Sequence, residues 1–170
     1  MVQMARMEEI KLWKLDEMEI EQLIAEYKLG KRDFPRLNLP RIDLHKAHLA
    51  DINLSQAYLY RAILKKAHLE RAFLNHAILN NANLQQAQLF RASLIAADLE
   101  NADLTKAILN HANLNGTNLC RANLSHAHLV WANLRHADLT DANLNHADLS
   151  GAKFCQTIMP DGTVRNDHCH

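Results

Sequence analysis

An apolar residue recurs at every fifth position of this chain from Phe34 to Phe154. The positions between these two phenylalanines hold 23 leucines. A second column lies two residues earlier and is Ala in 20 of the 25 repeats, with the exceptions Arg32, Leu37, Ile42, Ile52 and Thr117. A continuous helix would rotate successive leucines by a net angle of about 140°. A continuous strand would place them on alternate faces. Neither regular element buries the column on one side.

Every leucine can face one axis if the chain turns in the same sense after each pentad. The small Ala side chains then face inward where there is less room, and the three mostly polar residues between them face solvent. Coils stacked about 4.8 Å apart would pair their backbone groups with one another. The spacing therefore predicts a β solenoid. It differs from a leucine-rich repeat, whose units have 20–29 residues and unequal leucine spacing.

Six units with regular composition carry a family resemblance: AHLER, ANLQQ, ADLEN, ADLTK, ANLSH and ADLTD. They resemble the A(D/N)LXX consensus of pentapeptide-repeat proteins, and the resemblance covers residues 32–156. It implies a right-handed quadrilateral β-helix with four pentads in each coil, or about six coils here. The units AYLYR, AILKK, AFLNH and AILNN depart from this consensus, because apolar or aromatic residues replace the Asp or Asn.

The two ends lack the repeat. Residues 4–29 are predicted to be helical, with a capping box at Asp16 and Glu19, a C-cap at Gly30 and a shorter first segment over 6–15. The apolar stripe of the main helix is Ile20, Leu23, Ile24 and Tyr27. We interpret residues 1–31 as an N-terminal helical cap on the solenoid of residues 32–159. A partner-binding helix is the alternative.

The C-terminal tail, residues 160–170, begins with the turn signal Pro160-Asp161-Gly162. We expect it to fold over the last coil, either to protect the open strand edge or to form a dimerisation surface. An odd number of cysteines without an export signal favours reduced thiols, while a Cys155–Cys169 bridge stays open as an alternative. No secretory signal or membrane span is recognisable, which predicts a cytoplasmic protein.

A four-sided coil stacks residues that are 20 apart, and this spacing converts the sequence into a surface map. One side gathers the candidate partner-binding patch, which comprises Phe90, Ile108, Val130 and Trp131. A neighbouring side carries a secondary patch of Tyr58, Tyr60 and Ile78. Exposed apolar residues that lie together can mark an interaction site.

Polar columns are the other feature of this map. One column runs Lys46, Lys66, Gln86, Lys106, His126 and His146. It could contact phosphates, but it is more simply a solvated face. The eleven histidines form no closed set of four ligands, so we predict no metal site and no cofactor. The chain contains no Gly-rich phosphate loop, HExxH or GxSxG motif, and a leucine-filled rod has no substrate cavity. We therefore expect no catalytic residue and no enzyme activity.

These features favour a non-catalytic protein-binding or scaffold module, monomeric or an end-to-end dimer. Nucleic-acid, membrane and small-molecule partners are disfavoured. The resemblance implies one alternative, because some family members mimic B-DNA and bind type II topoisomerases such as gyrase, conferring fluoroquinolone resistance. Such mimicry requires an acidic surface. Residues 32–156 carry 13 basic and 10 acidic residues, and the whole chain has no net charge, which argues against this role.

Overall fold

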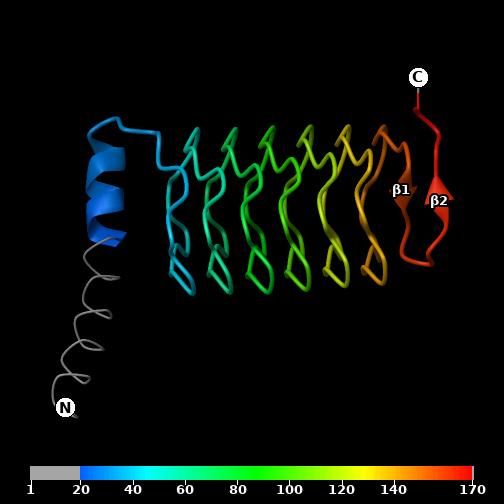
Figure 1. The fold of residues 1–170 in the computed structure, drawn as a ribbon, viewed down its shortest axis with the longest axis horizontal. Helices are drawn as coiled ribbons and strands as arrows, with labels where there is room; N and C mark the ends of the chain where they lie inside the picture. The colour runs from blue at the N-terminus through cyan, green and yellow to red at the C-terminus, as the bar shows by residue number, and fades with distance from the viewer. Residues whose placement is uncertain (1–19, 170) are drawn as a thin grey trace, which may run out of the picture. The chain divides into compact units, whose positions relative to one another are not determined.

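The structure is a computed structural model that describes residues 20–169, and the chain divides into the units Met1–Arg32 and Asp33–His170 (Figure 1). In the first unit a helix spans residues 20–28. The predicted capping box and the first helical segment lie outside the described residues. No helix among residues 20–169 combines the length and the apolar character that a membrane crossing requires.

The helix of residues 20–28 ends in a Schellman motif. Gly30 has a φ of 98°, which favours glycine, and its N–H donates to the carbonyl of Tyr27 at 3.0 Å. The N–H of Lys31 donates to the carbonyl of Glu26 at 3.1 Å. Together these two bonds satisfy carbonyls that a helix end would leave unpaired. The predicted C-cap at Gly30 is confirmed.

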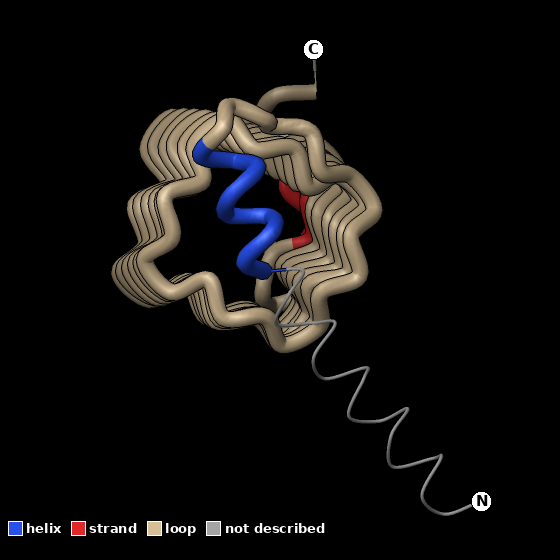
Figure 2. Tube along the Cα trace, turned by 90° about the vertical axis from the view of Figure 1, so that its left-hand side faces the viewer, coloured by secondary structure: helices blue, strands red, loops and turns tan. Residues whose placement is uncertain are grey.

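The second unit is a stack of coils in which each residue of the Asp/Asn column pairs with the residue 20 positions later. These parallel bridges run without interruption from Asp33↔Asn53 to Asp138↔Ile158. Each coil therefore contains four pentads, as the surface map assumes. Figure 2 shows the coils superposed in a four-sided outline. Each side contributes a single bridged residue instead of an extended strand. The strands of the described residues are β1 (Thr157–Ile158) and β2 (Val164–Arg165), which pair antiparallel.

The pentad of residues 82–86 shows how the backbone is satisfied. The Ala82 N–H donates within the preceding turn to the Leu79 carbonyl at 3.0 Å. The Asn83 N–H bonds to the previous coil at 2.9 Å, and the N–H groups of Leu84 and Gln86 bond to the next coil at 2.7 and 2.9 Å. The remaining N–H, that of Gln85, donates to the Asn83 side chain at 3.1 Å. The Asp or Asn of the repeat thus satisfies the one backbone donor that the stacking of coils leaves over.

The core consists of the two predicted inward columns. The leucines from Leu39 to Leu139 are at most 3% exposed, and the alanines at every fifth position from Ala57 to Ala137 are at most 1% exposed. Thr117 is buried in the Ala column, where its hydroxyl donates to the Leu94 carbonyl at 2.8 Å. The prediction is wrong for Leu144 and Leu149, which are only half-buried. These two leucines belong to the last coil, and no complete coil follows to cover them.

A disulfide between Cys155 and Cys169 closes the tail, with their Cα atoms 4.8 Å apart. The expectation of reduced thiols is wrong for this pair, because the number of cysteines does not show that the tail returns and brings Cys169 next to Cys155. Further contacts hold the tail to the solenoid. The His168 N–H donates to the Phe154 carbonyl at 2.8 Å, and the Arg135 guanidinium donates to the His168 carbonyl at 2.8 and 3.0 Å. The Arg165 guanidinium lies 3.8 Å from the centroid of the buried Phe154 ring.

Candidate functional site

The four residues of the predicted partner-binding patch lie on one side of the solenoid. Ile108 is bridged to Gln88 and His128, and the His111 N–H donates to the Val130 carbonyl at 2.9 Å. Trp131 is 57% exposed, whereas Phe90, Ile108 and Val130 are half-buried. The patch therefore presents one prominent aromatic ring and three partly covered neighbours.

Neighbouring side chains account for this difference in exposure. The Phe90 ring meets the His111 ring edge-on, with centroids 5.7 Å apart, and the Arg91 guanidinium lies 5.1 Å from the Phe90 centroid. The Trp131 indole lies against Gly151 in the next coil, where a Cβ atom would come within 2.7 Å of the ring. A glycine at 151 thus leaves the space that the indole fills, while the outer face of Trp131 stays open.

Two of the three residues of the secondary patch are exposed, compared with one of four in the first patch. Tyr58 and Ile78 are bridge partners in consecutive coils, and each is 39% exposed. The Tyr58 and Tyr60 rings stack with centroids 6.2 Å apart, and the Arg61 guanidinium lies 5.2 Å from the Tyr60 centroid. The structure therefore brings together all three residues that the sequence placed in this patch.

Two further exposed apolar side chains, which the sequence analysis missed, lie on the two sides of the coil that adjoin the side of Tyr58 and Ile78. Ile63 is 39% exposed and Phe73 is 49% exposed, each one pentad away from a residue of the secondary patch. We name the set Tyr58, Tyr60, Ile63, Phe73 and Ile78 the Tyr58 patch. Its signal was present in the sequence, because the units AYLYR, AILKK, AFLNH and AILNN put apolar residues where Asp or Asn would otherwise face solvent.

The potential ligands for a metal ion are the histidine, cysteine and acidic side chains of the described residues. None of their His, Cys, Asp and Glu side chains form a group of three or more that could hold a metal ion. His126 and His146 stack with ring centroids 4.8 Å apart, and His48 and His68 stack with centroids 4.5 Å apart. These histidines therefore occur as pairs of parallel rings.

Cys120 is the free cysteine of the described residues, and its environment disfavours the thiolate. Burial raises the pKa of the Cys120 thiol, and the neighbouring Asp138 carboxylate raises it further. The Thr140 hydroxyl donates to the same carboxylate at 2.5 Å, which lowers the Asp138 pKa. A thiol that stays protonated is a poor nucleophile. This group offers no support for covalent catalysis.

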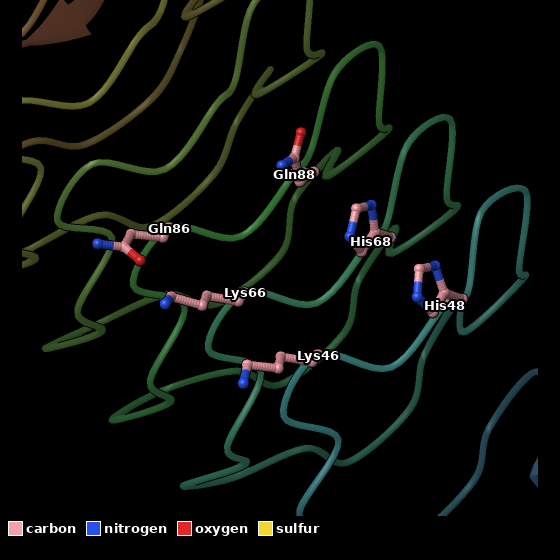
Figure 3. Close-up of a pocket in the computed structure, with 6 residues that line it drawn as sticks. All are labelled: Lys46, His48, Lys66, His68, Gln86 and Gln88. Atoms are coloured by element: carbon pink, nitrogen blue, oxygen red, sulfur yellow. The ribbon is translucent and has the colours of Figure 1, made fainter.

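A polar groove of about 400 Å³ runs across three consecutive coils. Its walls are two rows of side chains, Lys46, Lys66 and Gln86 in one row and His48, His68 and Gln88 in the other (Figure 3). The first row is the beginning of the lysine column that the sequence analysis interpreted as a solvated face. The second row belongs to the bridged column of the same side.

A coil of four five-residue sides that repeats every 20 residues defines this protein as a solenoid of pentapeptide units. The chain belongs to the pentapeptide-repeat family. The model of that family, described as pentapeptide repeats, matches in eight copies, within residues 38–75, 64–94, 74–105, 87–125, 97–135 and 122–159. None of the curated proteins is significantly similar to the chain.

Solved structures provide further comparisons. A pentapeptide-repeat protein, Rfr23, from the cyanobacterium Cyanothece 51142 is 32% identical over 75% of this chain and 87% of its own, with a TM-score of 0.50. HetL from the cyanobacterium Nostoc, involved in the regulation of heterocyst differentiation, is 28% identical over 84% of this chain and 98% of its own, with a TM-score of 0.27. QnrB1, a plasmid-mediated fluoroquinolone resistance protein, is 17% identical over 74% of this chain and 69% of its own, with a TM-score of 0.32.

Proposed function

We propose that this protein is a non-catalytic binding or scaffold module that engages a protein partner through the Tyr58 patch. The observation that supports the proposal is the set of large apolar side chains that four neighbouring pentads expose where the repeat normally presents Asp or Asn. Tyr58, Ile63, Phe73 and Ile78 are 39–49% exposed. Clustered exposed apolar residues on a protein surface indicate an interaction site.

The scaffold beneath the patch suits this role. The N–H groups of Tyr58 and Ile78 bond to the previous coil at 2.7 and 2.9 Å, and the leucines that follow them are fully buried. A preformed surface loses little conformational entropy when a partner binds, which favours affinity. Tyrosine is also enriched among residues that dominate binding energy at interfaces. The proposed partner therefore presents an apolar surface centred on the side of the solenoid that carries Tyr58 and Ile78.

A pair of matched double variants tests this proposal. Tyr58→Ser with Ile78→Ser removes the centre of the patch, and Trp131→Ser with Val164→Ser removes two exposed apolar residues elsewhere. Each variant is used as bait in cells of the native organism, together with the unmodified protein, and the partner is identified by co-purification and then bound in purified form.

We expect the purified partner to bind the unmodified protein and the Trp131/Val164 variant, and to lose binding to the Tyr58/Ile78 variant by at least about tenfold. Circular dichroism checks that both variants keep the fold. Equal binding by all three proteins would contradict the assignment of the Tyr58 patch. Loss of partner binding in the Trp131/Val164 variant alone would favour the patch around Trp131 instead.

We further infer that the solenoid winds right-handed through about six coils and that residues 1–31 cap its first coil, as the family resemblance and the apolar stripe support. The gyrase alternative is disfavoured by the basic excess of residues 32–156, and a supercoiling assay with purified gyrase would reveal it. The Cys155–Cys169 disulfide counts against the predicted cytoplasmic location, because structural disulfides persist mainly in oxidising compartments. Localisation of the tagged protein tests that prediction.

A further inference from the structure

Two parallel rows of nitrogen-bearing side chains line the polar groove on one side of the solenoid. His48, His68 and Gln88 are successive bridge partners, and the two imidazole rings stack with 13° between their planes. Lys46, Lys66 and Gln86 form the second row, two residues earlier in each coil, and their side chains extend side by side (Figure 3). The coil repeat of about 4.8 Å makes the groove about 10 Å long.

The groove is positively charged, because Lys46 and Lys66 line it and none of its six described lining residues is acidic. Two carboxylates in these coils already have partners. Glu70 bonds to Nδ1 of His68 at 3.1 Å, and Asp51 accepts two bonds from the Arg71 guanidinium at 2.6 and 2.7 Å.

We propose that this groove binds a short chain of phosphate groups, such as an inorganic oligophosphate or the phosphate chain of a nucleotide. Lysine ammonium groups bind phosphate as point charges, and imidazole and amide N–H groups donate to its oxygens. Because equivalent donors recur in each coil, a ligand with several linked oxyanions can engage more than one coil, whereas a single carboxylate cannot.

The third coil sets the length of the ligand. Gln86 and Gln88 replace the Lys and His of the first two coils, so the positive charge is interrupted there while hydrogen-bond donors continue, and the next cation of the column is Lys106, one coil beyond the groove. A long polyanion would bind most tightly to a column that carried positive charge in every coil. Two charged coils followed by a neutral one suit a ligand of two or three phosphates. The inference does not rest on the Tyr58 patch, whose residues belong to the three other bridged columns of the coil.

The third coil also supplies the substitutions for the test. Gln86 shows that glutamine adopts the turn conformation of Lys46 and Lys66, with a φ of 58°, and Gln88 occupies the same column as His48 and His68. The double variants Lys46→Gln with Lys66→Gln and His48→Gln with His68→Gln therefore repeat side chains that the fold already accepts at equivalent positions. The control, Arg121→Gln with Lys153→Gln, removes the same charge from exposed sites in other columns, outside the groove.

Isothermal titration of the full chain with sodium tripolyphosphate, at physiological salt, measures the binding. We expect the Lys46/Lys66 variant to bind at least about tenfold more weakly and the control to change less than about twofold. The His48/His68 variant changes the second row, and it should also bind tripolyphosphate more weakly than the unmodified protein.

A titration with ATP distinguishes the two sources of phosphate. Equal affinity for ATP and tripolyphosphate assigns the contacts to the phosphate chain alone, whereas tighter binding of ATP adds a nucleotide preference. Equal weakening in the Lys46/Lys66 variant and in the control would reduce the effect to general electrostatics and overturn the proposal. Absence of measurable binding to both ligands would also overturn it.

Discussion

At the scale of single residues, the solenoid depends on a turn position with positive φ. The third residue of nearly every turn from Arg36 to Gln156 has this conformation, with φ between 50° and 62° at the residues that are not glycine. The turn closes with a bond from the next Ala N–H to the preceding Leu carbonyl, and a positive φ at its third residue is characteristic of type II turns. Residues other than glycine pay a conformational cost in this region. Arg, Lys, His and Asn nevertheless occupy most of these positions.

Gly116 allows this backbone cost to be measured directly. Its φ is 66°, and no atom lies within 4 Å of the site of an added Cβ. We expect Gly116→Val to lower the free energy of unfolding by about 1–2 kcal/mol, because a β-branched residue adopts positive φ poorly. Gly116→Asn is the matched variant and should cost clearly less, since Asn tolerates this region. Urea denaturation measures both, and equal losses would show that φ does not limit this position.

Side-chain contacts to the turns also predict a pH dependence. The Thr140 hydroxyl and its N–H lower the Asp138 pKa below the ordinary 3.8. A carboxyl with a lowered folded-state pKa contributes stability above its unfolded pKa and loses that contribution as the pH falls through the folded value. Thr140→Ala should raise the Asp138 pKa and cost about 0.5–1.5 kcal/mol at pH 7.

Carboxyl NMR titration measures the Asp138 pKa, and denaturation at pH 7 and below pH 3 measures the change in stability. The stability difference between Thr140→Ala and the unmodified protein should shrink at the acidic pH, where Asp138 is protonated in both proteins. A difference that stays constant over this range would show that the carboxylate is not involved.

At the scale of elements, stacked turns replace long strands, and the tail forms the main hairpin. β1 continues the bridge ladder through Ile158, and β2 pairs with it at Val164 and Arg165. Gln156 N–H donates to the Asn166 side chain at 2.7 Å, so the hairpin is held at both ends. The disulfide adds a covalent closure to these contacts.

Cys155→Ser tests how much this closure contributes to the tail. A loop of about 15 residues corresponds to about 3 kcal/mol in the chain-entropy account of disulfides. We expect faster hydrogen exchange in residues 157–168 and little change in the coils of residues 54–134, because each coil bonds mainly to its neighbours. Cys120→Ser is the control and should leave the tail unchanged. Equal exchange in the two variants would show that hydrogen bonds alone fasten the hairpin.

At the scale of the whole molecule, the solenoid is a linear array of coils, and each coil makes equivalent contacts with the coil before it and the coil after it. Deletion of residues 93–112 removes 20 residues and rejoins Ala92 to Asn113, which restores the pentad and every column. We expect this variant to fold cooperatively with lower stability, since repeat proteins gain stability from each added interface. Deletion of residues 93–110 puts leucines out of register and should abolish the cooperative transition. Circular dichroism during heating distinguishes the two, and similar melting curves would contradict the stacking register.

Particular residues show how much of the structure could be predicted from the sequence. Leu99 and Ala97 could be assigned to the core from the five-residue period alone, because only one side of each pentad can be buried. The Tyr58 and Ile78 pairing followed from the interval of 20. Ile63 and Phe73 were missed as a surface because the columns were considered one side at a time. The partial cover of Phe90 by His111 and Arg91 depends on side-chain conformation, which the repeat does not specify.

By itself, the sequence determined the repeating path of the backbone. Apolar columns that recur every five residues can be buried together in a solenoid, but not in a continuous helix or a continuous strand. Only the tertiary structure decided which outer side chains meet. Contacts between coils join residues 20 positions apart, and their exposure depends on neighbours in two adjoining coils at once. The same is true of the Cys155–Cys169 bond and of the half-exposed leucines of the last coil, because both depend on where the stack ends.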